Sequence, residues 1–181
     1  MRIVAGSARG RTLLGPKSEV TIRPTADRVR QTLFDVLGQR CDGLEVLDLY
    51  AGTGALGLEA VSRGARHATL VDSGREAQEL CRRNAEALGF APRVELLAMT
   101  ASAALDVLQK RRVAFDLVFV DPPYALEAGG PTLHTLEAKG LLAPHGRVVV
   151  EHSSLEIIAG GGTLALEDER RFGATVLSIF R

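Results

Sequence analysis

A glycine loop between a predicted strand and a predicted helix constrains the fold of this chain more than any other stretch. Residues 46–50 are mostly aliphatic, β-branched or aromatic, which is typical of a parallel strand buried on both faces. Gly52 and Gly54 follow, and glycine permits backbone angles that side chains forbid and lets a ligand approach the main chain closely. From Leu56 onward apolar residues recur at helical spacing, so the free amides of the helix start would point toward the loop. The stretch therefore predicts a ligand site between a strand and a helix.

Two cofactor classes use such a turn. The three glycines of Gly52-x-Gly-x-x-Gly57 satisfy the dinucleotide fingerprint, with Asp72 about twenty residues further on as the acid for the ribose. Asp48 favours the other class, because Asp-x-x-x-Gly-x-Gly resembles the first motif of S-adenosylmethionine-dependent methyltransferases, in which the acid reaches the methionine end of the cofactor. An acid that only caps the following turn is the alternative without function. The candidate cofactor-binding residues are Asp48, Ala51, Gly52, Thr53, Gly54, Asp72 and Met99. Met99 follows a predicted third strand, at the level where methyltransferases hold the adenine, and ordinary core packing is the alternative for it.

The composition fits one domain of ordinary size. The chain has 181 residues, of which 46% are hydrophobic, and this is enough for a single core. It contains no run of about eighteen apolar residues and no apolar block after Met1, so we expect neither membrane insertion nor export. Cys41 and Cys81 form no Cys-x-x-Cys pair and have no histidines at ligand spacing. We therefore expect a cytoplasmic protein with reduced, packed cysteines and no metal.

Basic residues are concentrated near the amino terminus. Residues 1–40 hold eight basic and three acidic side chains, whereas the rest of the chain holds fourteen and nineteen. This asymmetry indicates that the amino-terminal end faces a polyanion, although a solvated arginine-rich surface is the alternative. Two short apolar segments joined by a glycine-containing connection predict a basic β-hairpin arm over residues 1–22, with little apolar surface of its own, before a main domain at 23–181. The candidate phosphate contacts are Arg9, Arg11, Arg23, Arg28 and Arg30, the last two on the exposed face of a helix that Thr25 caps.

The remaining patterns predict an α/β architecture. Helices are expected over 74–88 and 133–142, and the last two strands form a hairpin. His152, like the other histidines, is expected at the surface or in a loop, and with Glu151 it is a candidate for the wall of the substrate crevice. Together the elements predict a Rossmann-like, seven-stranded, mostly parallel sheet with an antiparallel last strand. The strands expected after the first are 67–71, 94–97, 115–120, 146–151, 164–171 and 175–180.

Asp121-Pro122-Pro123-Tyr124 follows the predicted strand at 115–120 and is the most specific motif of the sequence. Two consecutive prolines donate no ladder hydrogen bonds and make the turn rigid, so its carbonyls stay free to accept from a substrate. The exocyclic amine of a nucleobase is a poor nucleophile because its lone pair is delocalised into the ring. Asp121 and the Pro122 carbonyl could each accept one N–H and draw the amine out of plane, while Tyr124 stacks on the flipped base. These four residues are the candidate catalytic group.

Three blocks resemble one family of enzymes. The segments 23–34, 47–60 and 118–124 are similar to the bacterial small-subunit ribosomal RNA guanine-N2 methyltransferases (RsmD-like), and the opening Met1-Arg-Ile-Val-x-Gly6 matches as well. The resemblance implies S-adenosyl-L-methionine as the cofactor and methylation of the N2 amine of one guanine, conventionally numbered 966, in 16S RNA. It also implies that the substrate is the assembling 30S subunit, which fits a basic hairpin that binds RNA. Separately, we expect a monomer.

Alternatives remain open on the residues alone. Asp-Pro-Pro-Tyr also serves amino-methyltransferases that act on adenine or cytosine in DNA or RNA, and the sequence does not encode the identity of the base legibly. A noncatalytic ribosome assembly factor with this fold would be expected to have lost Asp48, Asp72 or Asp121, and all three are present. An NAD-dependent oxidoreductase has no role for Asp-Pro-Pro-Tyr.

Overall fold

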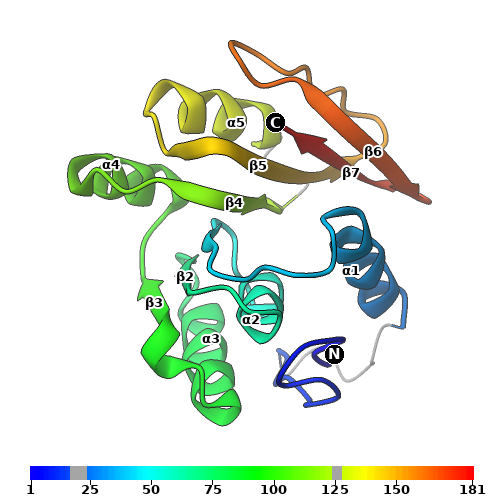
Figure 1. Ribbon diagram of the computed structural model, residues 1–181, viewed down its shortest axis with the longest axis vertical. Coiled ribbons are helices and arrows are strands. Elements are labelled where there is room, and N and C mark those ends of the chain that lie inside the picture. The colour runs from blue at the N-terminus through cyan, green and yellow to red at the C-terminus, as the bar shows by residue number, and fades with distance from the viewer. Residues whose placement is uncertain (17–23, 124–127) are drawn as a thin grey trace.

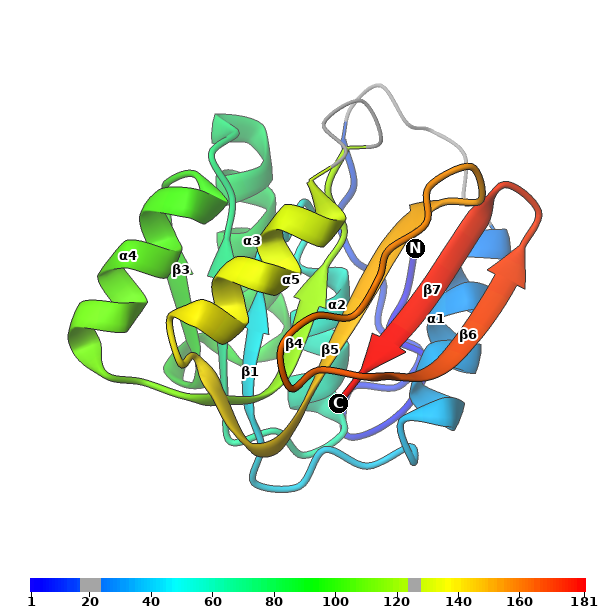
Figure 2. The ribbon, with the colours of Figure 1, turned by 90° about the horizontal axis from the view of Figure 1, so that it is seen from above.

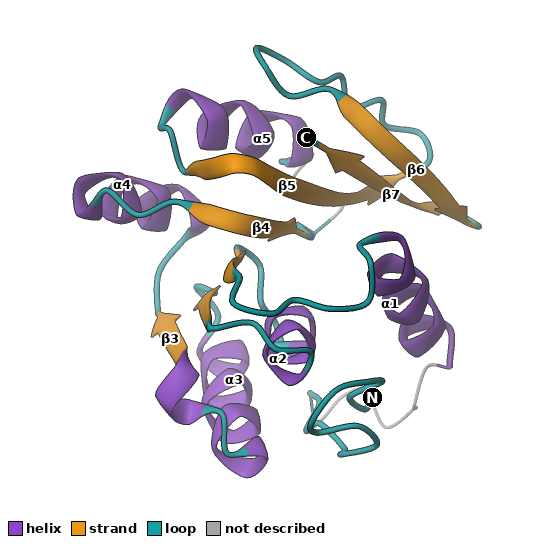
Figure 3. Cartoon of the chain, viewed as in Figure 1, coloured by secondary structure: helices purple, strands orange, loops and turns teal. Residues whose placement is uncertain are grey.

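The computed structural model describes residues 1–16, 24–123 and 128–181, with only the backbone described for 24–26. A seven-stranded sheet forms the central layer, with helices on both of its faces (Figure 1). The helices alternate with the strands along the chain up to β5, as Figure 3 shows. The strands are β1 Glu45–Asp48, β2 His67–Val71, β3 Val94–Leu97, β4 Phe115–Val120, β5 Leu142–Ser153, β6 Leu166–Phe172 and β7 Thr175–Phe180. The helices are α1 Pro24–Val36, α2 Ala55–Ser62, α3 Arg75–Leu88, α4 Ala101–Arg111 and α5 Gly129–Ala138, with a short 3-10 helix at Ala91–Arg93.

The order of the strands indicates where a ligand crevice would lie in the sheet. They lie in the order β3-β2-β1-β4-β5-β7-β6, with β1 to β5 parallel and β7 antiparallel to both of its neighbours. In Figure 2 the arrows of β1, β4 and β5 point upward and that of β7 points downward. The predicted sheet is confirmed, including its antiparallel last strand. From β1 the chain adds β2 and β3 on one side of the sheet, and then adds β4 and β5 on the other side of β1. Ligands of such sheets bind outside the carboxyl ends of the strands at this switch point between β1 and β4.

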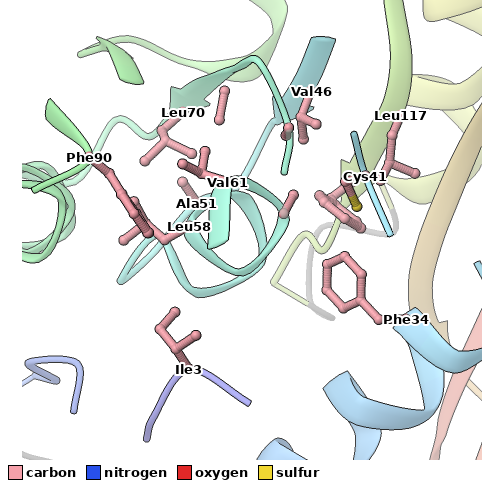
Figure 4. Close-up of a cluster of buried hydrophobic side chains, with 14 of the residues drawn as sticks. Ile3, Phe34, Cys41, Val46, Ala51, Leu58, Val61, Leu70, Phe90 and Leu117 are labelled. Carbon is pink, nitrogen blue, oxygen red and sulfur yellow. The ribbon is translucent and has the colours of Figure 1, made fainter. Parts of the chain in front are cut away.

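Two hydrophobic clusters cover the two faces of the sheet. Phe119 and Val149 pack with α1, α2 and α3 on one face, whereas Val118 and Val150 pack with α4 and α5 on the other. This alternation follows from the period of two along a strand, and because both faces are covered the strands are apolar at nearly every position. Figure 4 shows part of the first cluster, in which Phe34 of α1 meets Phe119 edge-on with ring centroids 5.9 Å apart.

The amino-terminal segment packs onto the first cluster instead of projecting from the domain. Its apolar side chains Ile3, Ala8 and Leu13 are at most 6% exposed. In Figure 4 the side chain of Ile3 points toward Leu58 of α2. The expectation that the hairpin contributes little apolar surface was therefore wrong. The boundary at residue 22 lies outside the described residues and stays a prediction.

The hairpin itself is shorter than predicted. In the described residues 1–16 the pairing is one antiparallel bridge between Arg2 and Thr12. Beside it the Ile3 amide donates to the Arg11 carbonyl at 2.9 Å and the Leu13 amide donates to the Met1 carbonyl at 3.0 Å. The amides of Val4 and Ala5 donate instead to the two carboxylate oxygens of Glu59, at 2.7 and 2.9 Å. A buried carboxylate of α2 thus takes the donors that a longer ladder would need, and the arm is attached to the domain by charge-assisted hydrogen bonds.

Several helix boundaries differ from the sequence prediction. Helix α1 begins at Pro24, so Thr25 lies inside the helix and not at its N-cap, and proline is well suited to this first position. Helix α5 ends at Ala138, four residues before the predicted end, and Gly140 follows with a φ of 63°. Helix α4, which the sequence reading did not place, is capped by the Thr100 hydroxyl, which accepts from the Ala103 amide at 3.3 Å. Within the described parts of the chain, no helix is long and apolar enough to span a bilayer.

Candidate active site

Four carboxylates gather at the carboxyl edge of the parallel strands. Asp48 is the last residue of β1, Asp72 follows β2, Asp121 follows β4, and Glu151 lies near the end of β5. Hydrogen-bonded neighbours in the sheet bring these ends together, since β1 pairs with both β2 and β4, and β4 pairs with β5. The sequence placed Asp72, Asp121 and Glu151 at strand ends and Asp48 within the first predicted strand. The structure ends β1 at Asp48, and the order of the strands brings the four acids to the same end of the sheet.

Asp48 is buried, and one of its two carboxylate oxygens has no hydrogen-bond partner in the described part of the chain. It is 1% exposed, and its Oδ2 accepts from the Gly57 amide at 3.1 Å. This contact needs glycine, because a Cβ at Gly57 would lie 2.3 Å from Cδ2 of Leu70. The other oxygen, Oδ1, has no hydrogen-bond partner in the described part of the chain. Burial, and secondarily the charge of Asp72, raise the pKa of Asp48 to about 7 against the opposing effect of the Gly57 amide. A buried oxygen without a donor is costly, and it indicates a donor that a ligand supplies.

The glycine loop is held against Asp72. The Gly52 amide donates to Oδ2 of Asp72 at 2.9 Å, and the Gly74 amide donates to Oδ1 at 2.8 Å. Each oxygen therefore keeps lone pairs for a further donor, such as one of two adjacent hydroxyls. Gly52 and Gly54 have φ values of 55° and 79°, and a Cβ at Gly52 would meet no atom within 4 Å, so the outer side of the loop is open. Behind the loop, burial raises the pKa of the Cys81 thiol to about 12, and its Sγ lies 3.3 Å from the Gly52 carbonyl, to which it donates.

A cavity of about 580 Å³ extends from the loop toward α1. This volume is typical of a small-molecule site. Its polar wall includes Asp48, Asp121 and Glu151, the loop residues 51–53, and the side chains of Arg30 and Thr175. Asp72 and Met99 do not line it, so the site consists of this cavity and the adjoining open surface above β2 and β3. The apolar wall includes Val29 and Leu33 of α1 and Phe119, Val149 and Leu177 of the sheet.

Asp121 has an unusual electrostatic environment. Burial, followed by the negative charges of Glu151 and Asp48, raises its pKa to about 8. The three carboxyl groups line one cavity, in which Glu151 and Asp48 disfavour the ionised form of Asp121. Pro122 beside it is buried and Pro123 is exposed. Tyr124 lies outside the described residues.

Comparison with known proteins places the chain in a family. The family model described as Conserved hypothetical protein 95 matches residues 1–181. The putative rRNA methyltransferase YlbH of Bacillus subtilis is 32% identical over 182 residues, which cover 100% of this chain and 98% of that protein. Ribosomal RNA small subunit methyltransferase D of Escherichia coli K12 is 38% identical over 151 residues, 83% of this chain and 74% of that protein. The chain belongs to this RsmD-like family.

The structural comparison agrees with the family. The structure of the putative methyltransferase yhhF from Escherichia coli has a TM-score of 0.86 and 32% identity, and the match covers 99% of this chain and 96% of that one. The fold is the Rossmann-like fold of S-adenosyl-L-methionine-dependent methyltransferases, as predicted.

The arginines predicted to bind RNA fall into two groups. Arg9, Arg11 and Arg28 are exposed, although Arg11 also donates to the Ala87 carbonyl at 2.6 Å. Arg30 was expected on the exposed face of its helix, and this was wrong, because it is 4% exposed. Arg23 lies outside the described residues.

Arg30 is buried because it joins three elements. Its guanidinium donates to Asp27 at 2.8 Å and to the Arg2 carbonyl, and its Nε lies 3.6 Å from the Glu59 carboxylate. Glu59 also accepts from Arg63 Nε at 2.8 Å. These charges tie α1, α2 and the amino-terminal segment together. Arg30 also lines the cavity, and its role as a phosphate contact stays a prediction.

Two residues that the sequence reading missed support the site. Glu59 anchors the hairpin, and its position as an acid inside the apolar run of α2 was the available signal. Asn84 of α3 accepts from the Leu14 amide at 2.8 Å and donates to the carbonyls of Leu14 and Thr53 at 3.1 and 2.9 Å. It thereby links the hairpin to the glycine loop. His152 was expected near the surface but is 3% exposed, with Nε2 2.8 Å from the Ser178 hydroxyl.

Proposed function

We propose that this protein transfers the methyl group of S-adenosyl-L-methionine to the N2 amine of a guanine in 16S ribosomal RNA, by resemblance guanine 966. Its substrate would be the assembling 30S subunit in the cytoplasm, and the enzyme would act as a monomer. The observation that carries the proposal is the convergence of Asp48 and Asp121 on one cavity at the switch point of a methyltransferase sheet, with Asp72 bonded to the glycine loop beside it. The relatives named as ribosomal RNA methyltransferases support the choice of RNA.

The residues present fit this cofactor. The partnerless Oδ1 of Asp48 can accept from the ammonium group of its methionine part, and the remaining lone pairs of Asp72 can accept from the two ribose hydroxyls. Gly52 and Gly54 carry no side chains that would block approach to the loop, and Met99, two residues after β3, would pack on the adenine. When bound, S-adenosyl-L-methionine supplies a methyl group already activated on a sulfonium.

The chain then has to prepare the amine. Asp121 and the Pro122 carbonyl would each accept one N–H of the guanine N2 amine, which orients the lone pair and withdraws it from the ring. N2 gains the methyl group and loses one proton. Asp121, with a pKa raised to about 8, is suited to take that proton, and Tyr124 would stack on the base.

The test is the methylation state of ribosomal RNA in cells that lack the protein. Mass spectrometry of 16S RNA should show the loss of one N2-methylguanosine, restored by the intact gene and not by Asp121→Ala. Purified Asp121→Ala should still bind the cofactor, because its role is in the transition state. Unchanged ribosomal RNA together with a lost methyl group on adenine or cytosine would favour the alternative substrates. Unchanged nucleic acids with defective subunit assembly would favour the noncatalytic factor.

A further inference from the structure

Glu151 stands beside Asp121 in the cavity. Val120 of β4 pairs in parallel register with Val150 of β5, so Asp121 and Glu151 are the next residues of two neighbouring strands. They follow the alternation of Phe119 and Val149, which face the first hydrophobic cluster, and both line the cavity. Neighbouring strands lie about 4.8 Å apart, so the two carboxyl groups can contact adjacent atoms of one ligand.

An acidic wall of this kind suits one nucleobase edge better than the others. Guanine presents two adjacent donors, the ring N1–H and the N2 amine. Adenine and cytosine each present an amine beside a ring nitrogen that is an acceptor. Ionised carboxylates only accept hydrogen bonds, so a ring acceptor facing Glu151 would meet lone pairs, whereas the guanine N1–H would meet a partner.

We propose that Glu151 accepts the N1–H of the target guanine while Asp121 holds its N2 amine, and that Glu151 thereby selects guanine over adenine and cytosine. This assignment rests on the proposed function, since it takes methylation of a base amine as given. A separate observation shows that the cavity is shaped for a ligand: Oδ1 of Asp48, on the same wall, is buried without a partner in the described part of the chain.

The charges in the free protein point the same way. Glu151 is the largest charge effect among those that raise the pKa of Asp121, ahead of Asp48. Two adjacent N–H donors would relieve this repulsion between carboxylates. A site built to bond a substrate N–H rejects an analogue without it by factors up to about 10⁴ to 10⁵, and a partly solvated site by less.

The experiment compares guanine with two analogues at the position that the wild-type enzyme methylates. Small subunits are reconstituted with 16S RNA ligated to carry guanine, 2-aminopurine or 6-thioguanine there. 2-Aminopurine keeps the amine but has an unprotonated N1 and lacks O6, whereas 6-thioguanine keeps both donors and changes only the atom at position 6. The wild-type enzyme should methylate guanine and 6-thioguanine, and 2-aminopurine at least about 100-fold more slowly.

Glu151→Gln provides the decisive readout, because the glutamine amide can donate to an unprotonated N1. Its rate on guanine should fall, and the ratio of its 2-aminopurine rate to its guanine rate should rise at least about 10-fold above the wild-type ratio. The matched control is Glu79→Gln on the exposed face of α3, which should leave the ratio unchanged. Cofactor binding by calorimetry shows whether each variant is folded.

If the rate of Glu151→Gln falls equally on both substrates, so that the ratio of the two rates is unchanged, the proposed role of Glu151 is overturned and it is a structural residue. Should that variant not fold, Glu151→Asp replaces it: a reader of N1–H predicts a slower guanine reaction with 2-aminopurine still rejected, and wild-type kinetics on guanine would refute the role. A wild-type enzyme that methylates no guanine in these particles would refute the proposed function itself, and the assignment of Glu151 with it.

Discussion

Replacing Asp48 with asparagine is expected to stabilise the free protein at alkaline pH while weakening cofactor binding. The pKa of Asp48 rises from 3.8 to about 7 because the carboxylate is buried with only one of its oxygens hydrogen-bonded to the Gly57 amide in the described part of the chain. The fold therefore favours the protonated acid. The contribution of Asp48 to the free energy of unfolding is therefore most favourable below pH 4, and it is lost as the pH rises toward 7.

The size of the effect follows from the pKa. The displacement from 3.8 to about 7 corresponds to a loss of about 4 kcal/mol in the free energy of unfolding above pH 7. Asparagine removes the charge and can still accept from the Gly57 amide. Its NH₂ group would lie where Oδ1 has no hydrogen-bond partner in the described part of the chain, at a cost of about 1–3 kcal/mol. We therefore expect Asp48→Asn to be more stable than the wild type by about 1–3 kcal/mol at pH 8.5, with the difference shrinking or reversing at pH 4.5.

Urea unfolding of cofactor-free protein between pH 4.5 and 8.5 measures this difference. The control is Asp106→Asn, whose exposed carboxylate pairs with Lys139 at 2.7 Å; this pair lowers the pKa of Asp106, so its removal acts in the opposite direction. In parallel, the affinity of the wild type for S-adenosyl-L-methionine should fall below pH 7, because protonated Asp48 no longer attracts a cation. A stability difference that stays constant across the pH range would refute this account of Asp48.

Three further changes test the cofactor site, the hairpin and the RNA surface. Asp72→Ala should weaken cofactor binding by about 1–3 kcal/mol, and an unchanged calorimetric affinity would show that Asp72 does not hold the ribose. Ile3→Ala should lower the free energy of unfolding by about 2–5 kcal/mol in urea, since Ile3 is fully buried, whereas Leu14→Ala, 39% exposed, should cost much less; similar costs would contradict the docking of the hairpin. Replacing Arg9 and Arg11 with alanine should reduce the salt dependence of binding to unmodified small subunits by about one or two phosphate contacts, and an identical slope would place the RNA surface elsewhere.

The sequence by itself determined the sheet and the positions of the acids. Strands buried on both faces are apolar at nearly every position, so residues 46–50 and 115–120 were recognisable without knowing their neighbours. Glycine and proline restrict the backbone locally, which is why the loop at Gly52 and the turn after Asp121 could be predicted. The resemblance to methyltransferases added the cofactor.

Tertiary structure alone decided which of these residues meet. The sequence alone predicts Arg30 as a surface arginine and the hairpin as a basic arm. In the structure the Glu59 carboxylate lies beside Arg30 and accepts from two amides of the hairpin. Glu151 became the neighbour of Asp121 only through the pairing of β4 with β5. Such contacts join segments far apart in the chain, and a buried charge or amide is satisfied by whichever partner the packing brings within reach, which no local pattern of residues specifies.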